Sequence, residues 1–392
     1  MNEHLIIRNF GPITSLDIDI KPFTVFIGEQ GSGKSTISKV LTICRDLLVQ
    51  ISIAKGDQEK VKEALREFGI FSFLKEDTYI EYSENCKIVF TKNKFSINKS
   101  EDYFTDKGIT TLKKIRSIYS ETKQSVKSIP QLQLLLNDLL NSFRPLLYIP
   151  AERIMATQLF PSMANILFSQ IPLGKPILGY MSLFEKARNS SPVFSVPFLG
   201  VTYMFSNNKN MIEVDESHAK ISLEEASSGI QSLLPLLLVF DYCSKQGYYN
   251  SFVIEEPEQN LFPSCQIELL RFILSQKGND NKHVGLVITT HSPYMLSALN
   301  NYLYAAELAN NPLVDKEEVD AVVPSNCQIS IDDCAVYSLG KNLNGGEYCK
   351  SVISEETHLI DFNYLDKVSM DMGSEFDRLQ NIYLNSLRKN RK

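Results

Sequence analysis

The chain has 392 residues, a length that allows two or three domains or one large α/β domain. Its 40 Lys and Arg against 46 Asp and Glu give a formal charge of −6, which argues against a protein that binds nucleic acid over its whole surface. A hydrophobic content of 43% excludes a mostly disordered chain. No apolar run reaches the ~20 residues of a membrane span, and the first residues lack the pattern of a secretory signal. We therefore expect a cytoplasmic protein without a membrane partner.

The seven cysteines form no CxxC pair. An odd number of cysteines in a cytoplasmic chain predicts reduced thiols and not a disulfide framework. Zinc is not expected, because the five histidines are scattered away from any paired cysteines.

Strand and helix patterns alternate in the first part of the chain. Short apolar or alternating runs bounded by Gly and Pro predict strands, and apolar residues recurring every three or four positions predict helices. In chain order, the sequence predicts strands at 5–10 and 16–20 around Gly11-Pro12, a buried strand at 23–27, helices at 37–53 and 58–68, an antiparallel pair within 78–98, a helical segment at 107–145 broken at Pro130, and a buried strand at 146–149.

The second part begins with about 70 residues of mixed pattern. Beyond residue 300 short helix and strand signals alternate, and the basic end at 388–392 predicts a frayed, solvated tail. Between these parts the sequence predicts a leucine-rich helix after Gly229, a strand at 251–254, a helix at 264–276 and a strand at 284–288.

A glycine-rich motif follows the buried strand at 23–27. Residues 28–36 match G-x-x-x-x-G-K-[ST] between a predicted strand and a predicted helix. Glycines let successive N–H groups point at phosphate oxygens, and the helix N-terminus adds a favourable dipole. Lys34 would bridge the β- and γ-phosphates, and the Ser35 hydroxyl would ligate Mg²⁺. The alternative is an ordinary strand–helix turn; the motif and its flanks favour a nucleotide site formed by Gly28, Glu29, Gln30, Gly31, Ser32, Gly33, Lys34, Ser35 and Thr36.

Two adjacent acids end the strand at 251–254. Glu255 would hold Mg²⁺ directly or through water, and Glu256 would orient or deprotonate the attacking water. Alone, acids at the end of a strand are as readily explained as solvated side chains. A phosphate loop in the same chain favours the functional interpretation, because such a loop needs an acidic Mg²⁺ partner.

Two further candidates follow the same logic. Ser227 or Ser228 can cap the leucine-rich helix and leave N–H groups for an anion, although a purely structural cap is by itself the favoured explanation of the serines. His291 follows the strand at 284–288, where its imidazole would meet the γ-phosphate or the attacking water. A lone histidine is more often structural, and only its place in the order of motifs favours a role at the site.

This order of motifs resembles the ATP-binding-cassette (ABC) class of ATPases, and within it the RecF/SMC/OLD-like branch of AAA-family ATPases. The resemblance covers essentially the whole chain. It rests on the opening Ile7–Pro12, the phosphate loop, Tyr148–Arg153 at the place of the Q-loop, Ala226–Gln231 as the signature, Glu255–Pro263 as Walker B and D-loop, and His291 as the switch histidine.

The resemblance implies a particular fold and mechanism. The fold would be α/β, an ABC-type P-loop ATPase head with a mixed central sheet, an N-terminal antiparallel β part and a helical lobe. Two heads would meet head to tail around ATP and Mg²⁺ as a homodimer or higher oligomer, with Glu256, His291 and Lys34 as catalytic residues. The signature residues of one copy, Ser227, Ser228, Gly229 and Gln231, would complete the phosphate loop of the other.

The chain departs from the family pattern in three places. Glu255 stands for the usual Walker B aspartate and reaches one methylene further. The Q-loop glutamine is absent, and we assign Glu152 to its place as a metal ligand. Serine replaces the first glycine of the signature, which leaves less space beside the phosphate.

We expect a single head over residues 1–392. Its parts would be an ATP-binding lobe with inserted helices (1–150), a helical lobe (151–222), the signature, Walker B and switch histidine (223–300), and a C-terminal α/β extension (301–392).

The chain has no sustained heptads between the phosphate loop and the signature, and no acidic cluster after His291 that resembles a TOPRIM nuclease. It therefore resembles the free-standing ATPase subunits of anti-phage defence systems such as PARIS, Septu and retron-linked systems. That resemblance implies a separately encoded effector, a nuclease or toxin, as a partner. One alternative is a nucleotide-binding subunit of a transporter, which the sequence disfavours. The other is a RecF-like repair ATPase that binds DNA through a group of basic residues, although a solvated basic helix is the favoured explanation of this group. The residues are Lys107, Lys113, Lys114, Arg116, Lys123 and Lys127.

Overall fold

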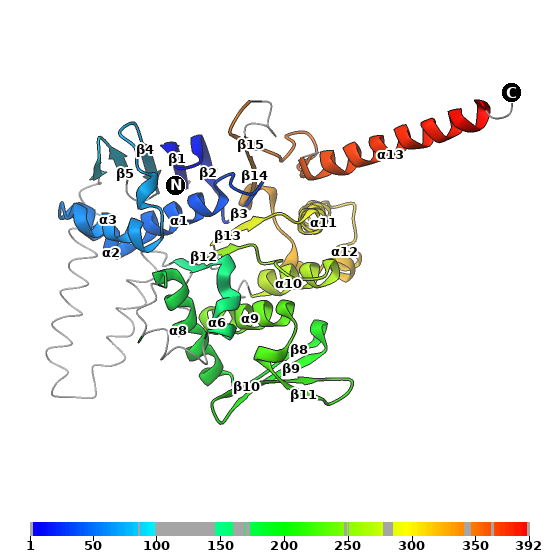
Figure 1. Ribbon diagram of the computed structural model, residues 1–392, viewed down its shortest axis with the longest axis horizontal. Helices are drawn as coiled ribbons and strands as arrows, with labels where there is room; N and C mark the ends of the chain where they lie inside the picture. The colour runs from blue at the N-terminus through cyan, green and yellow to red at the C-terminus, as the bar shows by residue number, and fades with distance from the viewer. Residues whose placement is uncertain are drawn as a thin grey trace.

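The computed structural model describes most of the chain as an α/β fold with three sheets (Figure 1). The described residues are 3–84, 87–98, 146–159, 168, 173–246, 249, 251–276, 285–340, 346–361 and 364–389. The helical prediction for 107–145, with the six basic residues of the DNA alternative, lies outside them.

A six-stranded mixed sheet forms the centre of the molecule. Its strand order is β15-β14-β3-β13-β12-β7, and all neighbours are parallel except β14 and β15. The carboxyl ends of the parallel strands therefore meet at one edge. The strands are β3 (Phe23–Gly28), β7 (Leu146–Ile149), β12 (Ser251–Glu255), β13 (Gly285–Thr290), β14 (Cys334–Leu339) and β15 (Cys349–Ser351).

Apolar side chains cover both faces of this sheet, as expected for a largely parallel sheet. Along β3, Phe26 points into one core, shared with the N-terminal sheet and helix α1 (Lys34–Arg45). Val25 and Ile27 point into the other core, shared with α9 (Ser228–Gln246), α10 (Pro263–Ser275) and α11 (Pro293–Ala309). Packing on both faces fixes the position of the loop that follows β3.

The N-terminal part is a five-stranded antiparallel sheet of order β2-β1-β4-β5-β6. The predicted pair within 78–98 is three strands, because Lys92 and Asn93 both take positive φ and form a tight turn that adds a further strand. The strands are β1 (Glu3–Phe10), β2 (Ile13–Ile20), β4 (Tyr79–Ser83), β5 (Lys87–Thr91) and β6 (Lys94–Asn98).

The helical pattern predicted for 37–53 is interrupted at Asp46. Helix α1 ends at Arg45, and α2 (Leu47–Ala54) begins after an extended Asp46. The Asp46 carboxylate accepts hydrogen bonds from the N–H groups of Leu48 (2.7 Å) and Val49 (3.1 Å), which is an N-cap. Helix α3 (Gln58–Glu67) follows as predicted.

Residues 151–222, expected to form a helical lobe, contain both helices and strands. Besides α6 (Met155–Gln158) and α8 (Lys175–Ser190), they form an antiparallel sheet of order β11-β10-β9-β8. Asn207 and Asn208 take positive φ and close its central hairpin. The strands are β8 (Val193–Val196), β9 (Val201–Ser206), β10 (Lys209–Val214) and β11 (Lys220–Ser222).

The C-terminal part is tied into the central sheet by β14, which pairs with β3. After α12 (Lys316–Val322), β14 and β15, helix α13 (Tyr364–Lys389) extends away from the rest of the molecule (Figure 1). In the described part of the chain, no helix is long and apolar enough to span a membrane. The cysteines described by the structure form no disulfide.

Candidate active site

The glycine-rich motif forms a loop between β3 and α1. Gly31 (φ 76°) and Gly33 (φ 100°) occupy the left-handed region, which favours glycine. The N–H of Ile37 donates to the Gly33 carbonyl (2.9 Å), so the helix begins directly after the loop. Glu29, Gln30 and Ser35 are exposed, whereas Lys34 and Thr36 are buried. The loop thus has the strand–loop–helix context that a phosphate cradle requires.

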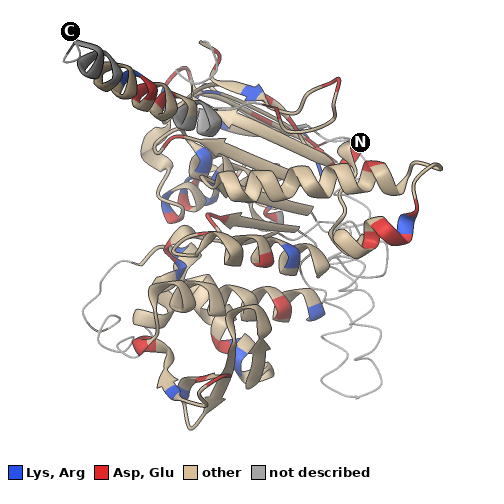
Figure 2. Cartoon of the chain, turned by 90° about the vertical axis from the view of Figure 1, so that its right-hand side faces the viewer, with Lys and Arg blue, Asp and Glu red and all other residues tan. Residues whose placement is uncertain are grey.

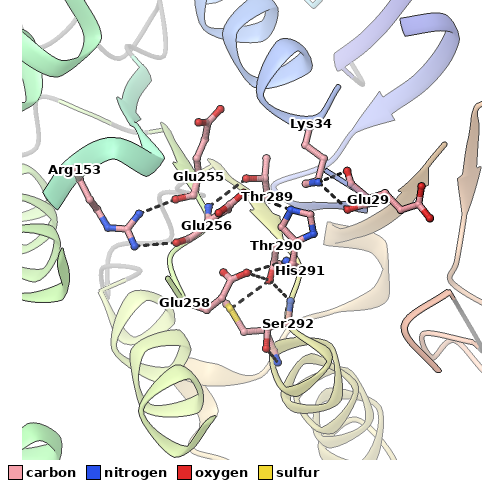
Figure 3. Close-up of polar contacts among 12 residues, drawn as sticks. Glu29, Lys34, Arg153, Glu255, Glu256, Glu258, Thr289, Thr290, His291 and Ser292 are labelled. Atoms are coloured by element: carbon pink, nitrogen blue, oxygen red, sulfur yellow. Dashed lines mark hydrogen bonds and ion pairs between the residues drawn. The ribbon is translucent and has the colours of Figure 1, made fainter. Parts of the chain in front are cut away.

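Lys34 folds back over this loop. Its Nζ donates to the carbonyl oxygens of Gly28 (2.7 Å) and Glu29 (3.0 Å) (Figure 3). Burial lowers the pKa of Lys34 to about 8, although Glu256, Glu258 and Glu255 raise it through their charges. The ammonium group therefore lies within electrostatic reach of all three carboxylates.

The C-terminal part of the chain braces the same loop. Tyr348 donates a hydrogen bond from its hydroxyl to the carbonyl oxygen of Ser32. A Cβ on Gly33 would lie 2.5 Å from that hydroxyl, and one on Gly28 would lie 2.6 Å from the Leu339 carbonyl oxygen. These two glycines are required by close packing as well as by backbone conformation, a constraint that the motif alone does not reveal.

Glu255 ends β12 as a buried carboxylate next to the loop. Burial raises the pKa of Glu255, and the charge of Glu152 raises it further, while Tyr148, Lys39 and Ser35 lower it. Glu255 Oε1 is buried and has no hydrogen-bond partner among the described residues.

This arrangement fits Mg²⁺, which prefers oxygen ligands and is held by one or two carboxylates together with substrate phosphates. Ser35 and Glu255 are the residues placed to hold it. Glu152 is exposed and is close enough to influence Glu255 electrostatically. The described residues contain no cluster of three or more His, Cys, Asp or Glu that could bind a metal without a substrate.

Glu256 follows in a strained turn. Its φ of 42° is positive, and its N–H donates to the Thr289 carbonyl (2.9 Å) at the end of the neighbouring strand β13. Its Oε1 lies 3.4 Å from His291 Nε2 (Figure 3), and this contact lowers the pKa of Glu256 most. The two predicted catalytic side chains are therefore in contact, at the ends of adjacent strands. A positive φ at a non-glycine residue is often associated with a functional site.

Arg153 holds this turn from behind, and sequence reasoning assigned it no role. It is completely buried, and its guanidinium donates to three successive carbonyl oxygens, those of Glu255 (2.8 Å), Glu256 (2.8 Å) and Pro257 (3.1 Å). The planar fork of arginine suits such a set of acceptors, since it presents several donors in fixed directions. Arg153 lies in the Tyr148–Arg153 motif, which is the sequence feature that points to it. The sequence prediction assigned a role only to the neighbouring Glu152, as a metal ligand.

Glu258 fixes the histidine loop in a similar way. Its buried Oε1 accepts from the Thr290 hydroxyl (2.7 Å) and the His291 N–H (2.8 Å). Burial raises the pKa of Glu258, and these two donors oppose that effect. The segment after β12 thus supplies both the candidate base and the carboxylate that orients its histidine partner.

The signature residues lie at the start of α9. Ser227 and Ser228 are exposed. The Ser227 carbonyl accepts the first helical hydrogen bond, from Gln231 N–H (2.9 Å), so Ser227 is the cap of the two candidates. A Cβ on Gly229 would lie 2.6 Å from the carbonyl oxygen of Asn260. The start of α9 therefore packs tightly on the segment that follows Glu258.

Gln231 has an internal role in the described structure. Its Nε2 donates to the carbonyls of Glu224 and Ala226 (2.8 Å each) and so braces the approach to α9. Pro235 inside α9 lacks an N–H, which leaves the Gln231 carbonyl without its helical donor. The Thr157 hydroxyl lies 3.0 Å from that oxygen and ties α6 to α9.

The comparisons with solved structures give low similarity over long alignments. The SMC head domain from Thermotoga maritima is 14% identical with a TM-score of 0.38, over 90% of this chain and 98% of that one. The Smc head domain with an extended coiled coil bound to the C-terminal domain of ScpA, from Pyrococcus furiosus, is 12% identical with a TM-score of 0.42, over 96% and 99%.

A search of curated proteins found no match to this chain. Residues 155–296 match the family model described as an AAA ATPase domain. The matched segment includes Ser227–Gly229, Glu255–Glu258 and His291, and does not include the phosphate loop. Over these residues, which carry the paired acids and the histidine of the site, the chain is similar to AAA ATPase domains.

Proposed function

We propose that this protein binds ATP with Mg²⁺ at residues 28–36 and hydrolyses it with Glu256 as general base. One observation carries the proposal: Lys34, Glu255, Glu256 and His291 converge at the carboxyl ends of β3, β12 and β13 (Figure 3). In open α/β sheets, ligands bind at this edge.

The residues of the chain divide the chemistry among them. The loop N–H groups, the N-terminus of α1 and Lys34 bind the phosphates. Ser35 and Glu255 would hold Mg²⁺, which would supply positive charge to neutralise the charge developing on the phosphate. Glu256 accepts the proton of the attacking water, and its lowered pKa keeps it ionised at neutral pH. His291 orients Glu256, and Arg153 fixes the backbone from which Glu256 projects.

We further propose that the whole chain acts as one head that pairs head to tail with a second copy. The support is the exposed N-terminus of the 19-residue helix α9 at Ser227 and Ser228, which presents N–H groups to an anion. The γ-phosphate bound by one copy would then be sealed by the signature of the other, so ATP would join the heads and hydrolysis would release them.

Glu256→Gln tests this function. We expect the variant to keep ATP binding in calorimetry, to lose phosphate release and to retain bound ATP after free nucleotide is removed, because the joined heads do not open. The matched control is Glu318→Gln, the same change at an exposed residue of α12, which should behave as wild type. Hydrolysis at the wild-type rate by Glu256→Gln would refute the assignment.

The biological role that we propose is control of a separately encoded effector, a nuclease or toxin, in anti-phage defence. The support is the resemblance of the motif order to free-standing ATPase subunits. The effector should be encoded by a neighbouring gene and should co-purify with this chain. The DNA-binding alternative remains a prediction, and a DNA titration at several salt concentrations would reveal it through a steep salt dependence of affinity.

A further inference from the structure

Helix α13 presents an exposed apolar stripe that the nucleotide site does not use. The helix extends away from the rest of the molecule (Figure 1), and its described side chains, from residue 370 to residue 383, are all exposed. Met372 is 67% exposed, Phe376 60% and Leu379 59%. An amphipathic helix of this kind gains stability by burying its apolar face, and concentrated exposed apolar surface indicates an interaction site.

The spacing of the stripe makes it complementary to itself. Met372, Phe376, Leu379 and Tyr383 follow one another at intervals of four, three and four residues, which places them on one face of the helix. This order of intervals is the same in both directions along the helix. When two copies run antiparallel, Met372 of each lies opposite Tyr383 of the other, and Phe376 lies opposite Leu379. The stripes then match over their whole described length.

The charges beside the stripe favour the same arrangement. Glu375 and Arg378 are three residues apart and lie on the same flank of the stripe, and Figure 2 shows charges of both signs on the helix. In an antiparallel pair, like flanks meet, so Glu375 of one copy lies beside Arg378 of the other. A parallel pair would instead bring unlike flanks together, so Glu375 of one copy would not meet Arg378 of the other. Charge and apolar spacing thus select the same partner and the same direction.

We propose that α13 is a dimerisation element that pairs antiparallel with α13 of a second copy, centred between Asp377 and Arg378. The contact is isologous, as in most homodimers, and needs no nucleotide. It would hold two heads together between ATP-binding events and raise the effective concentration at which the heads meet.

The test is the oligomeric state of the full chain without nucleotide, measured by sedimentation at micromolar concentrations. We expect a dimer for the wild type. Phe376→Glu/Leu379→Glu should weaken the dimer at least about a hundredfold, because unpaired charges would be buried in the contact. The control is Ser374→Glu/Asn381→Glu, which adds the same charge to the opposite face of the same helix and should leave the dimer intact. A monomeric wild type, or equal behaviour of the two variants, would overturn the proposal.

Charge reversal tests the direction of the pair. Arg378→Glu should weaken the dimer about tenfold, because Glu375 would then face a glutamate in both symmetric contacts. Adding Glu375→Arg should restore the wild-type affinity, since every contact becomes an opposite-charge pair again. Failure of the double variant to recover would overturn the antiparallel arrangement. Because no nucleotide is present, these results are independent of the fate of the proposed ATPase activity.

Discussion

Glu255, the last residue of β12, and the adjacent Glu256 have opposite electrostatic environments. Burial raises the pKa of Glu255, whereas the contact with His291 lowers the pKa of Glu256. A bound cation would therefore offset the cost of burying the Glu255 carboxylate, whereas Glu256 stays ionised and able to accept a proton. Divergent pKa values in neighbouring carboxyl groups are a common way to divide roles within an active site.

The role of His291 can be tested through the pH dependence of hydrolysis. Because the Glu256 pKa is lowered, wild-type activity should persist below the usual titration range of glutamate and fall only as the pH drops through the lowered value. His291→Gln removes the largest lowering influence, so the acidic limb of the kcat profile should move to higher pH. His218→Gln, at an exposed histidine paired with Glu213, is the control. Superimposable acidic limbs for wild type and His291→Gln would contradict this role.

The lowered pKa of Lys34 predicts that ATP binds more weakly at basic pH. Since its pKa in the nucleotide-free protein is lowered to about 8, the ammonium loses its proton as the pH rises above 8, and binding of phosphate must then be coupled to proton uptake. The Kd for ATP should rise between pH 8 and 9, by at most about tenfold per pH unit for one proton. Calorimetry from pH 7 to 9.5 measures this change. Lys34→Arg cannot deprotonate in this range and should give a flat profile; a flat wild-type profile would disprove the coupling.

At the scale of elements, the start of α9 and the segment after Glu258 are in close backbone contact at Gly229. Gly229→Ala would place a Cβ 2.6 Å from the Asn260 carbonyl oxygen, so the two elements must move apart. We expect a loss of about 1–3 kcal/mol in stability, as for overpacking elsewhere, together with lower ATPase activity. Urea unfolding and phosphate release measure the two effects.

The control for this substitution is Gly179→Ala within α8, where a Cβ meets nothing within 4 Å. That change should stabilise the protein by roughly 0.5–1 kcal/mol, because alanine is the better helix former. Equal responses at the two glycines would show that the contact with Asn260 does not constrain α9.

The features that could be predicted are those written in a few consecutive residues of the sequence. The phosphate loop, the paired acids and their strands follow from short patterns, and the structure contains those elements. The break at Asp46 was missed because the apolar spacing continues through it, and only the capping geometry separates the two helices. The direction of pairing between β14 and β3 was beyond any local pattern.

The supporting contacts of the site could not be predicted for the same reason. Arg153 acts on carbonyls about a hundred residues later in the chain, and backbone acceptors leave no mark in a sequence. Tyr348 reaches the Ser32 carbonyl across more than three hundred residues. The chemistry-bearing side chains are thus visible in the sequence, whereas the groups that fix their positions become visible only in the fold.

At the scale of the whole molecule, distant segments meet at both ends of helix α1, which begins at the nucleotide loop. A buried cluster joins β1, α1 and β12, because Arg45 pairs with Glu3 and donates to the Ser251 hydroxyl (2.5 Å). Tyr348 adds the C-terminal part of the chain. These contacts link the helix that begins at the loop to the N-terminal sheet and the central sheet, and Tyr348 links the loop itself to the C-terminal part, which lies next to α13 in sequence. Such connections between the nucleotide loop and the rest of the chain are needed if ATP binding is to control the pairing of two copies.

Complementation between two inactive variants tests whether the heads share their sites. Lys34→Ala disables a phosphate loop, and Ser227→Arg disables a signature, so each homodimer should be inactive. After subunit exchange about half of the dimers are mixed, and each mixed dimer has one site in which the intact loop of one copy meets the intact signature of the other. The mixture should therefore recover about a quarter of the wild-type ATPase rate. If each chain hydrolysed ATP alone, the signature would not be needed, so Ser227→Arg would stay active by itself and mixing would add nothing.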